Sequence, residues 1–130
     1  MNVDESLEEV EKALFELKEL NRTIPIIVEG KKDKKTLQKF GLKGNIIIFN
    51  RGSSLTDFCD NIASKYSEVI ILTDWDRRGG ALCRRMRELL KGRVKYNVEF
   101  RGQLGKNAMV RTVEGLYSWI ETMKSKNKEE

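Results

Sequence analysis

Hydrophobic residues follow two different patterns along the chain, short continuous runs and a spacing of three or four residues. Short apolar runs at 24–29, 45–49, 68–73 and 94–98 are typical of buried β-strands, because each is brief and most are rich in Ile and Val. Around them, apolar residues recur every three or four positions, which predicts helices over 3–20, 33–40, 54–66, 79–91 and 108–125. Strands that alternate with helices favour an α/β fold with a mainly parallel sheet of about four strands and helices on both faces.

Turn and cap residues predict where these elements begin and end. Asp33 is expected to cap the helix at 33–40, Gly41 to end it, and Ser53 or Ser54 to cap the next helix. Residues 50–52 predict a turn, and 101–107 a glycine-containing loop. The charged tail at 124–130 is expected to fray.

The helix at 3–20 is amphipathic. Its apolar residues follow a 4-3-4-3 spacing, at Val3, Leu7, Val10, Leu14 and Leu17. This spacing is typical of a helix packed on the sheet, and it also suits a seam for self-association or for docking on a protein partner. We therefore divide the chain into this helix (1–21), one domain (22–122) and a charged tail (123–130).

Composition excludes several kinds of chemistry and location. The chain has no His, which rules out a His base, a Ser-His-Asp triad and His metal ligands. No apolar run approaches the ~20 residues of a membrane span, and the acidic N-terminus does not resemble a signal peptide, so we expect a cytoplasmic protein. Cys59 and Cys83 match no zinc spacing and are interpreted as core thiols.

The net positive charge of the chain comes from the residues that follow its first helix. The net charge is +5, although residues 1–21 carry seven acidic and only two basic side chains. The remaining body is therefore strongly basic, which indicates a phosphate-rich partner such as RNA or DNA. The alternative interpretation is a well-solvated surface with no such partner.

Two strands end in carboxylates. Asp74 and Asp76 follow the run Val69–Leu72, and in an extended chain they would point to the same side, with Trp75 turned away. Such a pair calls for a hard cation with oxygen ligands, Mg²⁺ or Mn²⁺; Asp76 alone could instead be a helix cap, but this leaves Asp74 unexplained. Glu29 ends another strand and precedes Gly30. If the two strands are neighbours, all three acids meet at one edge of a parallel sheet.

These two motifs resemble the Toprim domain. They read Val-Glu-Gly-Lys-Lys-Asp at 28–33 and Asp-Trp-Asp-Arg-Arg-Gly at 74–79, and the resemblance covers about residues 22–120. It implies a Rossmann-like fold, Mg²⁺ held by Asp74 and Asp76, and Glu29 as the general acid/base or a third ligand. The small size is similar to that of ribosomal-RNA maturation nucleases of this family. Bulky Trp75 departs from the usual motif, and the roles of Trp75, Asp33 and Glu114 stay open.

Basic residues flank both motifs. Four of them would seat phosphates at the rim of the acids: Lys31, Lys32, Arg77 and Arg78. Arg84, in the basic stripe of the helix at 79–91, and Arg101 are further candidates for nucleic-acid contacts. For the stripe, an ordinary solvated helix face is an equal alternative. Glu114 is interpreted as helix surface.

The sequence predicts Mg²⁺-dependent phosphodiester chemistry on RNA or DNA, with a nuclease as the leading function. The main alternative is a non-catalytic module that binds nucleic acid or takes part in the assembly of a larger complex. A phosphatase that uses Asp-x-Asp is a weaker third candidate, because its motif normally continues with small or hydroxyl residues, whereas here Arg77 and Arg78 follow. Neither a P-loop nor a dinucleotide fingerprint is present.

Overall fold

The chain folds around a four-stranded parallel sheet. The computed structural model describes residues 3–49 and 52–129, with only the backbone described at 127–129. The strands are β1 (Ile26–Val28), β2 (Ile46–Ile48), β3 (Glu68–Ile71) and β4 (Lys95–Asn97), in the spatial order β2-β1-β3-β4. Every pairing in the sheet is parallel. The predicted α/β class and strand number are therefore confirmed.

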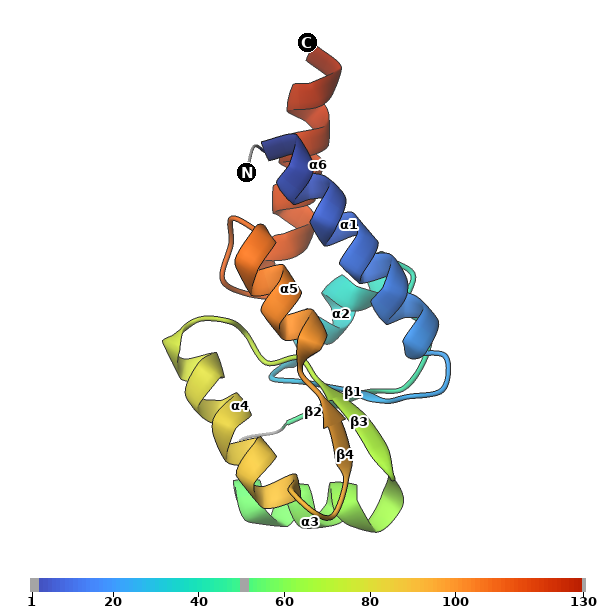
Figure 1. Cartoon of the computed structure of the whole chain (residues 1–130), viewed down its shortest axis with the longest axis vertical. Coiled ribbons are helices and arrows are strands. Elements are labelled where there is room, and N and C mark those ends of the chain that lie inside the picture. Colours follow the sequence, from blue (N-terminus) through green and yellow to red (C-terminus); the bar gives the residue numbers. More distant parts are fainter. Residues whose placement is uncertain (1–2, 50–51, 130) are drawn as a thin grey trace.

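Alternate strand residues separate the core into two layers. Ile27, Val69 and Ile71 face a layer formed with α3 (Leu55–Lys65) and α4 (Arg77–Leu90). Ile26 and Ile70, one residue out of phase, face a layer formed with α1 (Val3–Leu20), α2 (Lys31–Lys39), α5 (Glu99–Asn107) and α6 (Gly115–Glu129). The period of two in a strand produces this division, and Figure 1 shows the two groups of helices on opposite sides of the sheet.

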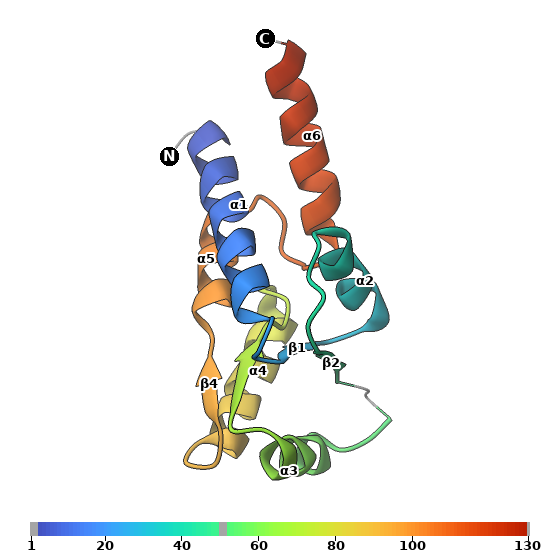
Figure 2. The same ribbon diagram turned by 90° about the vertical axis from the view of Figure 1, so that its right-hand side faces the viewer.

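The first helix completes the larger layer of the core. Its buried residues are Leu7, Val10, Ala13, Leu14 and Leu17, so most of the predicted apolar stripe faces inward. Val3, the first residue of the stripe, remains 44% exposed. Within this layer α1 contacts α5 more than any other element. Figure 2 shows that α1 begins and α6 ends at the same end of the molecule.

The segment at 101–107 is helical, so the predicted loop is wrong. Phe100 and Leu104 are buried in the larger layer, and their contacts with it offset the poor helix propensity of Gly102 and Gly105. The last helix begins at Gly115 and not at residue 108, because residues 108–114 form a connection whose backbone bonds to distant parts of the chain.

Smaller predictions also need correction. α2 begins at Lys31 with Gly30 as its N-cap, and Asp33 is instead the third helical residue, whose carboxylate accepts the Gly30 N–H at 3.0 Å. Ser54 caps α3 as predicted, by accepting the Asp57 N–H. α6 continues to Glu129, so the backbone of the predicted frayed tail is helical up to that residue. Of the predicted turn at 50–52, residues 50 and 51 lie outside the described residues.

Candidate functional site

The acids at the ends of β1 and β3 are in contact. The two strands are paired, with Ile26 opposite Ile70 and Ile27 opposite Ile71, so their carboxyl ends lie together. An oxygen of the Glu29 carboxylate accepts the backbone N–H of Asp74 at 2.8 Å. The expectation that the two strands are neighbours, and that their acids meet at one edge of the sheet, therefore holds for Glu29 and Asp74.

The turn between β3 and α4 is closely folded. The Asp76 carboxylate caps α4 by accepting the Gly79 N–H at 2.7 Å, and the Thr73 hydroxyl donates to the Gly79 carbonyl at 2.8 Å. A Cβ at position 79 would lie 1.8 Å from the Asp74 carbonyl oxygen, so only glycine fits there. The glycine of the second motif thus brings α4 against the backbone of the first Asp.

Asp74 lies in a strongly acidic environment. Burial raises the pKa of its carboxyl to about 7, and the negative charges of Asp33, Glu29 and Asp76 add to this effect. The backbone N–H of Val113 donates to Asp74 Oδ1 at 2.8 Å and lowers the pKa in part. Asp74 and Asp76 therefore interact electrostatically, although each carboxylate also accepts a backbone N–H.

Asp33 and Glu114 extend this acidic cluster. Asp33 is buried, and burial raises the pKa of its carboxyl, to which the charges of Glu29 and Glu114 contribute. Backbone hydrogen bonds from Gly30 and Glu114 oppose the rise. Glu114 lies in a turn before α6, and not on a helix surface as predicted. The sequence did not indicate that Asp33 and Glu114 lie together, because neither residue directly follows a predicted strand.

The chemistry of these donors fits a hard divalent cation. The charges that act on Asp74 are those of three carboxylates, and a cation placed among them would relieve their mutual repulsion. In the described part of the chain, however, no three Asp, Glu or Cys side chains converge closely enough to hold a metal by themselves. Mg²⁺ is commonly bound by one or two carboxylates together with water and substrate phosphate, so the donor set suits that mode of binding.

Basic side chains begin the two helices that follow these strands. α2 starts with Lys31 and Lys32, and α4 starts with Arg77 and Arg78; all four are exposed. Cations are unfavourable in the first turn of a helix, where the helix dipole prefers negative charge. Both helix starts also carry an acid, Asp33 in α2 and Asp76 at the cap of α4, so cations and acids lie side by side at the carboxyl ends of these strands.

Two further candidate residues have different surroundings. Arg84 is exposed on α4, two turns beyond the first residue of that helix. Arg101 extends from α5 back to the end of β3, where its guanidinium donates to the carbonyls of Thr73 at 3.2 Å and Asp74 at 2.8 Å. Arg101 thus holds the β3–α4 turn, and a phosphate contact would have to use its other N–H groups.

A segment that sequence reasoning missed closes over the second motif. We call residues 108–114, which connect α5 to α6 and cross between these helices in Figure 2, the strap. The Trp75 indole N–H donates to the Val110 carbonyl, and the Trp75 backbone N–H donates to the Arg111 carbonyl at 3.0 Å. The sequence left the role of Trp75 open, and these contacts match a packing role. The bulk of Trp75, which is unusual in this motif, was the one sign in the sequence that another segment packs against it.

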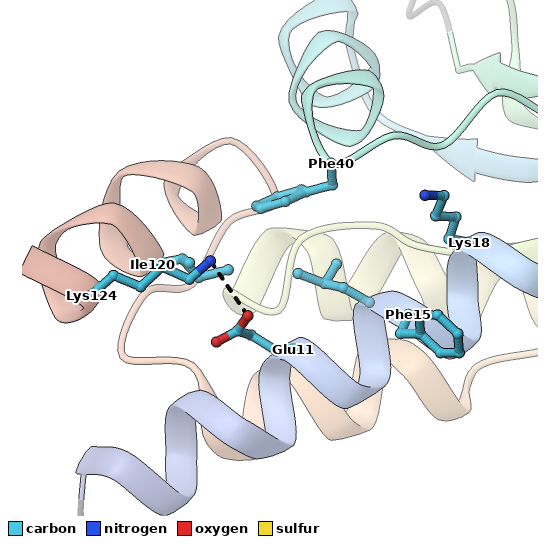
Figure 3. Close-up of a pocket in the computed structure, with 7 residues that line it drawn as sticks. Glu11, Phe15, Lys18, Phe40, Ile120 and Lys124 are labelled. Carbon is cyan, nitrogen blue, oxygen red and sulfur yellow. Dashed lines mark ion pairs between the residues drawn. The ribbon is translucent and has the colours of Figure 1, made fainter. Parts of the chain in front are cut away.

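A separate groove lies between α1, α6 and the end of α2. It encloses about 200 Å³ and contains an ion pair between Glu11 and Lys124 at 3.5 Å (Figure 3). Phe15, on its α1 side, is 64% exposed. Its remaining lining residues are Leu14, Lys18, Phe40 and Ile120. Docking or self-association through the helix at 3–20 stays a prediction.

Comparison with known proteins identifies the family. A sequence model of the Toprim domain matches residues 24–102. The UPF0292 protein of Thermoplasma volcanium is 46% identical over 97 residues, which cover 74% of this chain and 82% of that protein. The UPF0292 protein of Methanosarcina acetivorans is 37% identical over 124 residues, or 92% of this chain and 85% of that protein.

A solved structure agrees with this assignment. The chain is similar to a putative protein from Aquifex aeolicus with a TM-score of 0.62 and 33% sequence identity, over 88% of this chain and 97% of that one. Among the helices in the described residues, none has the length and apolar character to cross a bilayer. Toprim domains generally bind Mg²⁺ through acidic residues and act in metal-dependent processing of nucleic acids. The chain belongs to the Toprim domain family and, within it, to the UPF0292 proteins.

Proposed function

We propose that this protein is a Mg²⁺- or Mn²⁺-dependent nuclease that cleaves phosphodiester bonds in RNA or DNA. The observation that supports the proposal most is the contact between the Glu29 carboxylate and Asp74 at the carboxyl ends of the neighbouring strands β1 and β3. Two acids from separate strands, 45 positions apart in sequence, meet beside two helices that begin with cations. Structural packing alone does not require this combination of charges.

Each group has a defined role in this proposal. Asp74 and Asp76, with Glu29, would hold the divalent ion, which would neutralise negative charge at the phosphate. Glu29 moves the proton between the attacking or leaving oxygen and solvent. The phosphates beside the cleaved bond are held by Lys31, Lys32, Arg77 and Arg78, and Arg84 extends this contact along α4.

A second candidate is a non-catalytic module that binds nucleic acid through the same cations. One observation favours it: within residues 3–49 and 52–129, no three potential ligands are arranged in advance around a metal position. In this alternative Glu29 and Asp76 have a structural role, because they accept the backbone N–H groups of Asp74 and Gly79 in the turn before α4, and no bond is cut.

Cleavage assays with a charge-neutral variant separate the two candidates. We expect labelled RNA or DNA to be cut only when Mg²⁺ or Mn²⁺ is present, and Glu29→Gln to reduce the rate by about 10²- to 10⁴-fold, the usual contribution of a general acid or base. Gln keeps an oxygen that can accept the Asp74 N–H, so the turn should stay intact.

Glu16→Gln, at an exposed position on α1, is the matched control and should cut at the normal rate. Salt-sensitive binding without any metal-dependent cutting would contradict the nuclease and support the binding module. Cutting that survives in Glu29→Gln would remove Glu29 from the chemistry.

A further inference from the structure

Backbone and side-chain bonds run in both directions between the strap and the second motif. Trp75 donates two N–H groups to the strap, one to the Val110 carbonyl and one to the Arg111 carbonyl. The strap returns one, from Val113 to Asp74 Oδ1 at 2.8 Å. The strap therefore holds the Asp74 carboxylate oxygen, and Trp75, the next residue along the chain, holds the strap.

The Trp75 side chain is itself fixed between α5 and the strap. A Cβ at position 105 would lie only 3.2 Å from Trp75 Cβ, so the side chain rests directly on the glycine of α5. Trp75 also packs against the larger core layer. Replacing the indole by a phenyl ring would release Val110 while an aromatic ring, although a smaller one, stays against Gly105 and the core.

We propose that Trp75 is a positioning residue, which holds the strap so that the Val113 N–H orients the Asp74 carboxylate toward the divalent ion. The inference deepens the proposed function and rests on it. The strap lies beyond residues 24–102, the part of the chain that the Toprim model matches, so this support is added from outside the matched domain. Groups that orient a metal ligand commonly change metal affinity by 10- to 100-fold.

The chain offers a matched pair of substitutions for the test. Trp75→Phe keeps an aromatic ring but removes the indole donor to Val110. Trp119→Phe is the same change at the other of the two Trp residues, whose buried indole N–H has no hydrogen-bond partner among the described residues. A difference between the two variants therefore reports the hydrogen bond and not the loss of an indole.

Two measurements follow the proposed chain of contacts. Without metal, amide hydrogen exchange measured by NMR should be at least about 10-fold faster at Val113 in Trp75→Phe, and unchanged in Trp119→Phe. In titration calorimetry, Mn²⁺ should bind Trp75→Phe about 10-fold more weakly than the wild type, with Trp119→Phe again unchanged.

A second pair of variants disturbs Trp75 from the opposite side. Gly105→Ala would place a Cβ 3.2 Å from Trp75, whereas a Cβ at Gly102, in the same helix, would meet nothing within 4 Å. We expect Gly105→Ala, but not Gly102→Ala, to speed exchange at Val113 and to weaken Mn²⁺ binding. This pair keeps the inference testable if Trp75→Phe does not fold.

The results distinguish this inference from the proposed function. Unchanged exchange at Val113 in both Trp75→Phe and Gly105→Ala would overturn the inference, as would faster exchange with unchanged Mn²⁺ affinity. If instead the wild-type protein fails to bind Mn²⁺, the proposed function itself is overturned, and the orientation of Asp74 toward an ion falls with it.

Discussion

At the scale of single residues, Asp74 combines an unfavourable charge with three hydrogen bonds to distant parts of the chain. Its carboxyl accepts the Val113 N–H, its backbone N–H donates to Glu29, and its carbonyl accepts from Arg101. These bonds hold a carboxylate where burial and neighbouring acids disfavour its charged form. Carboxyl groups with such strongly perturbed pKa values cluster at functional sites.

The raised pKa of Asp74 predicts a pH-dependent gain in stability for Asp74→Asn. The pKa is about 7 in the folded protein and 3.8 ordinarily, so the wild type loses stability as pH rises between these values. Asn removes the charge and keeps an oxygen for the Val113 N–H. We expect about 1–2 kcal/mol of added stability at pH 8. This is less than the full pKa difference would give, because solvent screens the charge of a half-buried group.

Thermal unfolding at several pH values checks this prediction. The advantage of Asp74→Asn should be smaller at pH 5 and absent below pH ~4, where the carboxyl is protonated in both folded and unfolded chains. A variant that is less stable than the wild type at pH 8 would show that the charge of Asp74 does not destabilise the fold.

At the scale of elements, the parallel pairing of β1 and β3 determines the site. Their apolar runs predicted two buried strands, and the parallel order predicted that the acids after them would meet, as Glu29 and Asp74 do. The cap made by Asp76 also follows from local sequence. These features depend on residues close together in the chain or on the general rules of parallel sheets.

The features that sequence reasoning missed depend on distant contacts. α5 contains Gly102 and Gly105, which indicated a loop, and only burial of Phe100 and Leu104 against α1 and the sheet makes it a helix. The strap could not be predicted, because its bonds join residues 35 or more positions apart. Local propensity carries no information about such pairs.

The glycines of α5 allow a direct test of this balance. Gly102→Ala should raise the free energy of unfolding by about 0.5–1 kcal/mol, because Ala is the better helix former and its Cβ meets no neighbour within 4 Å. Gly105→Ala should gain less or lose stability, since its Cβ lies 3.2 Å from Trp75 Cβ. Urea unfolding of both variants measures the difference; equal gains would mean that Trp75 does not pack tightly on α5.

At the scale of the whole molecule, the basic and acidic charges lie in different places. The carboxyl ends of the strands carry the acids together with the cations of α2 and α4, while α1 carries most of its charge as exposed carboxylates. A nucleic acid should therefore approach the edge where the acids meet, and contacts to its phosphates should release counterions.

Salt dependence of binding locates this contact. We expect the double variant Arg77→Gln, Arg78→Gln to reduce the slope of log K against log salt by about 1.8 for duplex DNA, at about 0.9 per phosphate contact. The control is the double variant Arg22→Gln, Lys43→Gln. It removes the same charge from exposed positions before β1 and β2, at the amino ends of the strands. An equal fall in slope for both pairs would indicate attraction by net charge alone.

A crystal of the full chain soaked in Mn²⁺ would show whether Asp74 is a metal ligand. We expect an anomalous peak about 2 Å from a carboxylate oxygen of Asp74 and from one of Glu29 or Asp76, with water in the remaining positions. A peak found only elsewhere, or no peak beside Asp74 at saturating Mn²⁺, would contradict it.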